Sequence, residues 1–319
     1  MNGRDCRLVG GTDLAVSVLG IGGGSLANAG GDGAVRTLLD DAWDRGLRYF
    51  DTAALYAAGE SERRFGMGLR ERPRDEYVLS TKLGRFVDAA GQNAYDYTAA
   101  GAEQSLAGSM ERLGLDRVDI VFIHDLTPAL HGDSYEEKFR TCMAGAYPFL
   151  DGLRSRGIVG AVGIAMADAD VALQFAREGR FDCFMLAGGY TLLRHGSHGT
   201  LLDHCARSGS AVIVAAPFNT GILATGAVPG ARLDYAPARP EVLARVAAIE
   251  AACRRHGISL PAAALQFPLA HPAVASVVAG HQATTELDAN LALLAAPIPA
   301  GFWAELKATG LLAEEVPVP

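Results

Sequence analysis

The feature that most constrains this 319-residue chain is an alternation of short apolar runs with amphipathic stretches, repeated eight times. The apolar runs are rich in β-branched residues and nearly free of polar ones, which is typical of parallel strands buried on both faces. We expect strands at Val16–Gly20, Arg48–Asp51, Tyr77–Lys82, Val118–His124, Val159–Ile164, Phe181–Leu186, Ala211–Ala215 and Ala275–Ala279.

Between these runs, apolar side chains recur with the period of an α-helix. The predicted helices are Gly33–Arg45, Ser61–Leu69, Ala99–Leu113, Tyr135–Arg156, Asp168–Glu178, Gly199–Arg207, Pro261–Leu269 and Thr284–Leu294. Asp168 is a suitable N-cap, Pro261 suits a first helical turn, and Gly114 and Gly157 suit helix ends. Eight βα units predict one (β/α)₈ TIM barrel domain over residues 1–319 rather than an open sheet.

Two segments exceed the repeat. Gly226–Pro240 is rich in proline, glycine and alanine, and we expect a long loop there, after the seventh strand. Phe302–Pro319 is expected to form a terminal helix and a tail. Long loops at the C-terminal face of a barrel usually shape the substrate site.

The charge and the cysteines limit the partners of this chain. The net charge is −8 and no stretch concentrates lysine and arginine, so we expect a small-molecule substrate and neither nucleic acid nor a membrane. Five scattered cysteines without CxxC spacing predict neither a disulfide framework nor a zinc site. No apolar run approaches the ~20 residues of a membrane helix. Without a signal-like N-terminus, we expect a cytoplasmic protein, of unspecified oligomeric state.

Four polar side chains stand at or just after the ends of predicted neighbouring strands. Asp51 ends the second strand, Lys82 the third and His124 the fourth, and Tyr56 follows Asp51 in DTAALYAAGESE. A lone lysine or histidine at a strand end is more often a satisfied polar residue at the core margin. Because the C-terminal ends of barrel strands converge at one mouth, several aligned ends instead predict a catalytic group.

The roles of these four residues follow from acid–base chemistry. A free tyrosine has a pKa of about 10, and a neighbouring ammonium stabilises the phenolate and lowers that value. We expect Lys82 to supply the ammonium and Asp51 to keep it charged and oriented. Tyr56 would then donate a proton to a carbonyl oxygen or accept one from an alcohol. His124, in the neutral form, would orient the substrate oxygen.

With these residues the chain resembles the aldo-keto reductases, from LAVSVLGIGGGSL to LALLAAPIPAGFWAELKATGLL. The most specific pieces are DTAALYAAGESE, LSTKLGR, SMERLGLDRVDIVFIHD and LQFPLAHPAVASVVAG. The resemblance implies that Asp51, Tyr56, Lys82 and His124 form the catalytic tetrad of the family. STKLGR, LAGGYTLL and APFNTGIL are similar to the branch of aldose 1-dehydrogenases and pyridoxal 4-dehydrogenases. The similarity to this branch implies oxidation of the C1 hemiacetal hydroxyl of an aldose, such as L-fucose, to a lactone.

The resemblance also implies a nicotinamide dinucleotide bound across the barrel mouth without a Rossmann fingerprint. GIGGGS fits this, since it lacks the helix and acidic partner of such a fingerprint. The segment after the seventh strand is a candidate pyrophosphate cradle, and the segment after the eighth carries the adenine-contacting asparagine, Asn290. The cofactor-binding candidates are Phe218, Asn219, Thr220, Gly221, Leu223, Gly280, Gln282, Glu286 and Asn290.

Glu286 and Gln282 stand where the family often has basic residues that bind the 2′-phosphate of NADP. A carboxylate repels a phosphate and can accept hydrogen bonds from ribose hydroxyls, which favours NAD, with NADP as the alternative. The alternative for Glu286 is a solvated helix residue. The nicotinamide clamp departs from the family pattern, because Ala167 and Ala187 replace amide-bearing residues and Gly189 replaces an arginine. We expect Ser25, Arg85 and Asp125 to contact substrate, although a structural role for Asp125 is equally consistent.

Three other functions stay open. The chain could be an NADPH-dependent reductase of aldehydes or ketones, including pyridoxal-like or natural-product carbonyls. It could be a non-catalytic, nicotinamide-binding subunit that senses redox state, or a barrel aldolase that uses Lys82 as a Schiff-base amine. We expect no metal site, because His195, His198 and His204 lack an adjacent carboxylate pattern.

Overall fold

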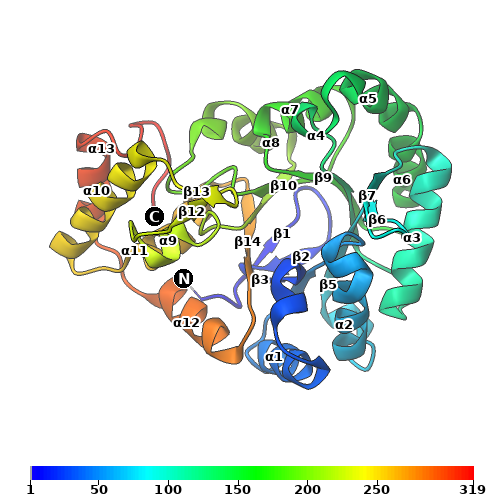
Figure 1. Ribbon diagram of the computed structural model, residues 1–319, viewed down its shortest axis with the longest axis horizontal. Helices are drawn as coiled ribbons and strands as arrows, with labels where there is room; N and C mark the ends of the chain where they lie inside the picture. The colour runs from blue at the N-terminus through cyan, green and yellow to red at the C-terminus, as the bar shows by residue number, and fades with distance from the viewer. Residues whose placement is uncertain (1) are drawn as a thin grey trace.

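The computed structural model describes residues 2–319 and confirms the predicted barrel. Eight parallel strands close on themselves in the order β10-β11-β14-β3-β4-β5-β8-β9, and helices surround them (Figure 1). The barrel strands are β3 (Leu19–Gly22), β4 (Tyr49–Asp51), β5 (Val78–Leu83), β8 (Ile120–His124), β9 (Ala161–Met166), β10 (Cys183–Ala187), β11 (Ala211–Ala215) and β14 (Val274–Gly280).

The helices connect successive strands and cover the outside of the barrel (Figure 1). They are α1 (Asp32–Asp44), α2 (Glu60–Leu69), α3 (Ala99–Leu113), α4 (Pro128–His131), α5 (Tyr135–Ala144), α6 (Ala146–Ser155), α7 (Ala169–Glu178), α8 (Leu201–Ser208), α9 (Ile222–Thr225), α10 (Pro240–His256), α11 (Leu260–Gln266), α12 (Thr284–Ala295) and α13 (Ala300–Ala308). Short 3₁₀ turns lie at Gly23–Asn28, Tyr56–Gly59, Arg74–Glu76, Gly132–Ser134, Gly196–Gly199 and Phe267–Ala270.

Three two-stranded hairpins lie outside the barrel sheet. They pair β1 (Cys6–Leu8) with β2 (Ala15–Ser17), β6 (Arg85–Val87) with β7 (Asn93–Tyr95), and β12 (Arg232–Leu233) with β13 (Ala236–Pro237). The β6–β7 hairpin directly follows β5, and the β12–β13 hairpin follows β11. Both therefore belong to connections at the C-terminal face of the barrel.

Apolar side chains form two layers of core. A small cluster fills the barrel interior, with Tyr49 and Phe122 as its largest members, and a larger one lies between strands and helices. Glycines make room for these interior rings: a Cβ on Gly20 would lie 2.7 Å from the Tyr49 ring, and one on Gly163 would lie 2.6 Å from the Phe122 ring. The interior is thus a packed core rather than a pore, which leaves only the mouth for chemistry.

The first predicted strand, Val16–Gly20, is wrong in its extent. The structure divides it between β2, which belongs to a hairpin, and β3, which belongs to the barrel and runs to Gly22. Val16 is fully buried in the interior cluster. A strand buried in a hairpin that closes the barrel end has the same apolar pattern as a barrel strand, so the pattern does not separate the two.

The predicted helix Tyr135–Arg156 is wrong as one helix, because it breaks at Gly145 into α5 and α6. A Cβ on Gly145 would lie 2.8 Å from the backbone nitrogen of Ala99, so the chain approaches the start of α3 too closely for a side chain. The eight predicted helices also omit α10 (Pro240–His256), which follows the predicted loop and packs against α13.

Helix ends agree with their sequence signals. The Asp168 side chain accepts hydrogen bonds from the backbone of Asp170 and Val171, and Gly114 ends α3 in the left-handed conformation. Among residues 2–319, no single helix is long and apolar enough to cross a membrane; α12 and α13 pass that test only together, and they are bent by 85°.

Candidate active site

A buried ion pair lies at the barrel mouth where β4 and β5 end. The Lys82 ammonium donates to Oδ2 and Oδ1 of Asp51 at 2.6 and 2.8 Å, and to the carbonyl oxygen of Thr52 at 2.8 Å. Ser80 donates to Oδ1 of Asp51 at 2.6 Å. The Lys82 and Asp51 side chains are only 1% and 3% exposed, so both charges depend on each other and on these bonds.

Tyr56 and His124 complete the group. The Lys82 nitrogen lies 4.8 Å from the centroid of the Tyr56 ring, and the Tyr56 and His124 rings meet edge to face with centroids 5.9 Å apart. The chain after Tyr56 is unusual, because Ala57 and Ala58 both have positive φ angles of 50° and 53°. Left-handed backbone at two alanines is costly, and such strain is commonly found at functional sites. The structure therefore brings all four predicted residues together.

The charge states at the site follow from burial and from these neighbours. Burial lowers the pKa of His124 well below its usual value, and the charges of Lys82 and Arg85 act in the same direction. Burial also has the largest single effect on Lys82 and lowers its pKa, but the Asp51 carboxylate and the Tyr56 side chain together outweigh it, and the net shift is upward. We infer a neutral imidazole beside a charged ammonium, as expected.

The expected lowering of the tyrosine pKa is wrong in its net direction. Burial raises the pKa of Tyr56, and this exceeds the opposing effect of the Lys82 charge. The nearby Asp51 carboxylate raises it further. The ammonium does favour the phenolate, but in the protein without a bound cofactor the Tyr56 phenol stays protonated near neutral pH.

Ser80 belongs to the same site and was not predicted. It lies two residues before Lys82 on β5, so both side chains point to the same face of the strand. It also lies 3.1 Å from the Tyr49 hydroxyl, deeper in the barrel. The period of two along LSTKL is the signal that would have found it.

Arg85 and Asp125 lie beside His124, as their places after β5 and β8 suggest. Nη1 of Arg85 contacts Oδ2 of Asp125 at 2.5 Å, and that oxygen lies 3.6 Å from Nε2 of His124. Ser25 is placed differently. Its hydroxyl donates to the carbonyl oxygen of His281 at 3.2 Å, so its side chain lies at the end of β14 with the cofactor candidates.

The segment after β11 has the backbone of an anion cradle. Ala216, Asn219 and Thr220 have positive φ angles, as does Gly221. The Asn219 amide donates to the carbonyl oxygen of Gly188 at 3.2 Å, while its buried Oδ1 makes no hydrogen bond to any described residue. Phe218 is half-buried beside it. Leu223 differs from the other candidates, because its side chain is fully buried in the core and leaves only backbone for a ligand.

The segment after β14 presents a ring of polar contacts. Oε2 of Glu286 accepts the backbone N–H of Gln282 at 2.6 Å, close to the start of α12. Nδ2 of Asn290 lies 3.0 Å from Nε2 of the fully buried His281, and burial lowers the pKa of that histidine to about 4. A Cβ on Gly280 would lie 2.7 Å from the Ser25 hydroxyl. A larger residue at Gly280 would therefore displace the Ser25 side chain.

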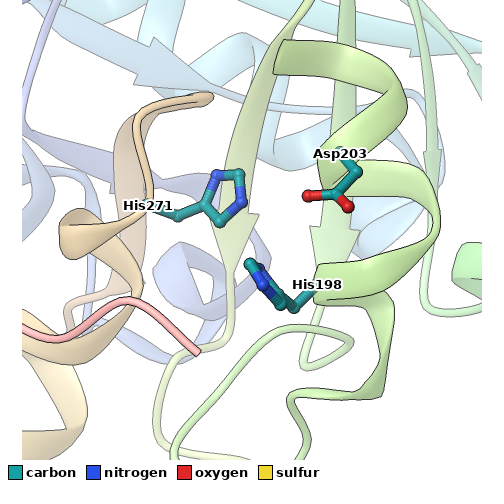
Figure 2. A group of neighbouring side chains, drawn as sticks. All are labelled: His198, Asp203 and His271. Atoms are coloured by element: carbon teal, nitrogen blue, oxygen red, sulfur yellow. The ribbon is translucent and has the colours of Figure 1, made fainter. Parts of the chain in front are cut away.

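A second polar cluster lies away from the tetrad. Figure 2 shows His198, Asp203 and His271 pointing toward one another, with potential ligand atoms within 4.8 Å of each other. The Asp203 carboxylate thus lies near His198 in space, which the pattern of the histidines along the chain does not indicate. Nδ1 of His271, however, accepts the backbone N–H of Ala273 at 3.2 Å, which places the proton of the neutral ring on Nε2. That proton opposes metal coordination through Nε2.

Comparison with known proteins identifies the family. The model of the aldo/keto reductase family matches residues 18–310. The chain belongs to the aldo/keto reductase family. It is 37% identical to D-threo-aldose 1-dehydrogenase of a Pseudomonas species, covering 94% of this chain and 95% of that protein. It is 32% identical to pyridoxal 4-dehydrogenase of Microbacterium luteolum, covering 96% and 97%.

A solved structure supports the same assignment. The holo form of an aldo-keto reductase of Bacillus halodurans superposes with a TM-score of 0.79 and 25% identity, over 98% of this chain and 97% of that one. This aldo-keto reductase is thus an oxidoreductase that uses a nicotinamide cofactor. Its own residues fit that cofactor: the orphan Oδ1 of Asn219 and the positive-φ backbone after β11 offer an acceptor and N–H donors at the mouth.

Proposed function

We propose that this enzyme oxidises the C1 hemiacetal hydroxyl of an aldose, such as L-fucose, to a lactone, with NAD as the cofactor. The observation that carries the proposal is the Tyr56 ring beside the buried Lys82–Asp51 pair, with His124 against its edge. The substrate class is supported by the 37% identity with an aldose 1-dehydrogenase along nearly the whole chain.

Each residue has a separable role in the proposed reaction. When bound, the oxidised nicotinamide supplies the acceptor for the hydride that leaves C1, and a positive ring charge. Tyr56 accepts the proton of the C1 hydroxyl, and the Lys82 ammonium stabilises its phenolate form. Neutral His124 donates a hydrogen bond from Nε2 to the reacting oxygen and so orients the sugar. C1 thus loses a hydride and its hydroxyl loses a proton, which leaves the lactone carbonyl.

The preference for NAD rests on the segment after β14. The Glu286 carboxylate accepts the Gln282 N–H at the start of α12, which is where backbone donors would otherwise favour a phosphate. A 2′-phosphate placed there would meet a carboxylate instead of a basic side chain. Residues after β11, chiefly Phe218 to Gly221, would hold the pyrophosphate, and Asn290 the adenine.

The decisive experiment combines cofactor binding with turnover. Purified protein is titrated with NAD and NADP, and then incubated with a panel of aldoses, pyridoxal and simple aldehydes while reduced nicotinamide absorbance is recorded. We expect NAD to bind at least tenfold more tightly than NADP and aldoses to give the fastest reduction.

Other outcomes favour other functions. NADPH binding at least tenfold tighter, with reduction of aldehydes or ketones as the faster direction, would replace the proposal with a reductase. Tight cofactor binding without turnover of any substrate would favour a redox-sensing subunit. Borohydride trapping of a carbonyl substrate on Lys82 would indicate an aldolase.

A further inference from the structure

The Arg85–Asp125 ion pair lies within reach of a bound substrate. Oδ2 of Asp125 is 3.6 Å from Nε2 of His124, which is the atom that orients the reacting oxygen. The Arg85 and Asp125 side chains are 18% and 24% exposed, in contrast to the sealed Lys82–Asp51 pair. Both come from connections at the C-terminal face, so the pair forms part of the wall of the mouth.

The backbone at Asp125 is held in a costly conformation. Its φ angle is 48°, in the left-handed region that favours glycine. The Asp125 N–H donates to the carbonyl oxygen of Ala165 at 2.9 Å, and the Tyr97 hydroxyl donates to the carbonyl oxygens of His124 and Asp125 at 3.0 and 3.3 Å. These contacts hold the backbone at Asp125 in place, and a costly backbone conformation maintained in this way is commonly found at functional positions.

The pair leaves hydrogen-bonding capacity unused. Among residues 2–319, Oδ1 of Asp125 has no donor, and Nε of Arg85 is buried without an acceptor. A partly buried carboxylate and guanidinium usually have most of these positions filled. The carboxylate therefore has room for one further donor, while its Oδ2 contacts Arg85.

A vicinal diol matches this arrangement. When the reacting oxygen is bonded to His124, the oxygen on the adjacent carbon lies within hydrogen-bonding reach of the same site, because only one C–C bond separates the two carbons. We propose that Asp125, oriented by Arg85, is a specificity-determining residue that accepts a hydrogen bond from the hydroxyl on the carbon next to the reacting carbon. The substrate is then an aldose with a free C2 hydroxyl, an inference that rests on the proposed function.

The test removes the C2 hydroxyl of the sugar and the carboxylate of Asp125, separately and together. Wild type, Asp125→Gly and Asp125→Asn are assayed with NAD and three matched pairs: L-fucose, D-glucose and D-galactose, each against its 2-deoxy counterpart. Glycine suits the left-handed backbone while it removes the carboxylate, and asparagine keeps the shape with a weaker, neutral acceptor. Asp88→Asn, a change in the turn of the β6–β7 hairpin, is the matched control.

A hydrogen bond to a charged group predicts that wild type prefers the 2-hydroxy sugar by roughly 10- to 100-fold in kcat/KM. This ratio should fall toward one in Asp125→Gly, lie between in Asp125→Asn, and stay at the wild-type value in Asp88→Asn. NAD titration and circular dichroism show whether the variants are folded.

Two results would overturn the inference alone: equal use of both members of a pair by wild type, or an equal loss on both members in Asp125→Gly. The first result is measured on wild type alone, so the inference can be tested even if Asp125→Gly does not fold. Absence of turnover with every aldose, alongside turnover of another class, would overturn the proposed function and the inference with it.

Discussion

At the level of single residues, burial and charge act on Tyr56 in opposite directions. Burial raises the pKa of its phenol, the Lys82 ammonium lowers it, and burial prevails in the protein by itself. Oxidation needs the phenolate, whereas reduction needs the phenol. The site at rest is therefore prepared to donate a proton, and a further positive charge beside Tyr56 is needed to make it a good base.

The Tyr56→Phe variant tests the proton transfer directly. We expect kcat for the sugar to fall by about 10²- to 10⁴-fold, the usual contribution of a general acid or base, because phenylalanine keeps the ring and loses the hydroxyl. NAD affinity, measured by titration of the ligand-free protein, should stay within a factor of two or so of wild type. Wild-type turnover in this variant would exclude Tyr56 from the reaction.

Removal of the ammonium should shift the pH profile. Since the Lys82 charge lowers the pKa of Tyr56, the Lys82→Met variant should move the alkaline rise of kcat/KM for oxidation upward, by roughly 1–3 pH units. The rate is recorded from neutral to alkaline pH, and NAD titration shows whether the variant is folded. A profile with an unchanged midpoint would mean that Lys82 does not act on the tyrosine.

At the level of elements, close helix packing positions the turn that carries Tyr56. Helix α2 begins directly after the Tyr56–Gly59 turn and lies against α3. A Cβ on Gly66 of α2 would lie 1.9 Å from the carbonyl oxygen of Leu113, so glycine permits this contact. Glu62 of α2 is fully buried and accepts bonds from Thr81 and Arg112 at 2.6 Å each, which ties the helix to β5 and α3.

Gly66→Ala should therefore destabilise the protein by about 1–3 kcal/mol, because the methyl group forces α2 away from α3. The matched control is Gly152→Ala, also within a helix, where a Cβ meets no atom within 4 Å. There we expect a gain of about 0.5–1 kcal/mol from reduced freedom of the unfolded chain. Urea unfolding measures both. Equal effects of the two substitutions would contradict the packing argument.

At the level of the whole molecule, buried neutral histidines make the fold sensitive to acid. Burial lowers the pKa of His271 and of His281 to about 4, and it lowers that of His124 well below its usual value. The folded pKa lies below the unfolded value of about 6.5, so unfolding takes up protons between these two values. Stability is full above pH 6.5 and is lost as the pH falls toward 4.

Urea unfolding at several pH values from 7.5 to 4.5 measures this loss. We expect the free energy of unfolding to decline by about 1.4 kcal/mol per pH unit for each histidine that gains a proton only on unfolding. His281→Gln, where it stays folded, should show a shallower decline than wild type. A free energy of unfolding that rises on acidification through this window would show that the histidines are not buried as described.

The amino-acid sequence by itself determined the barrel and brought its candidate catalytic residues to one mouth. The period of apolar runs reports parallel strands, and in a barrel the strand ends meet at one mouth, so Asp51, Lys82 and His124 could be placed together before any coordinates. Tyr56 followed from the same stretch of chain. These inferences succeed because the periodicity of apolar residues and the order of the strands can both be read directly along the sequence.

Only the tertiary structure decided what depends on contacts between distant segments. The split of β2 from β3 depends on the pairing of β3 with the distant β14, while β2 pairs with the neighbouring β1. The break at Gly145 comes from its approach to Ala99. So do the pairing of Asp125 with Arg85 and the meeting of His198 with His271. The pKa of Tyr56 rises because folding removes water from its phenol, and the degree of burial is a property of the packed barrel that no single segment contains.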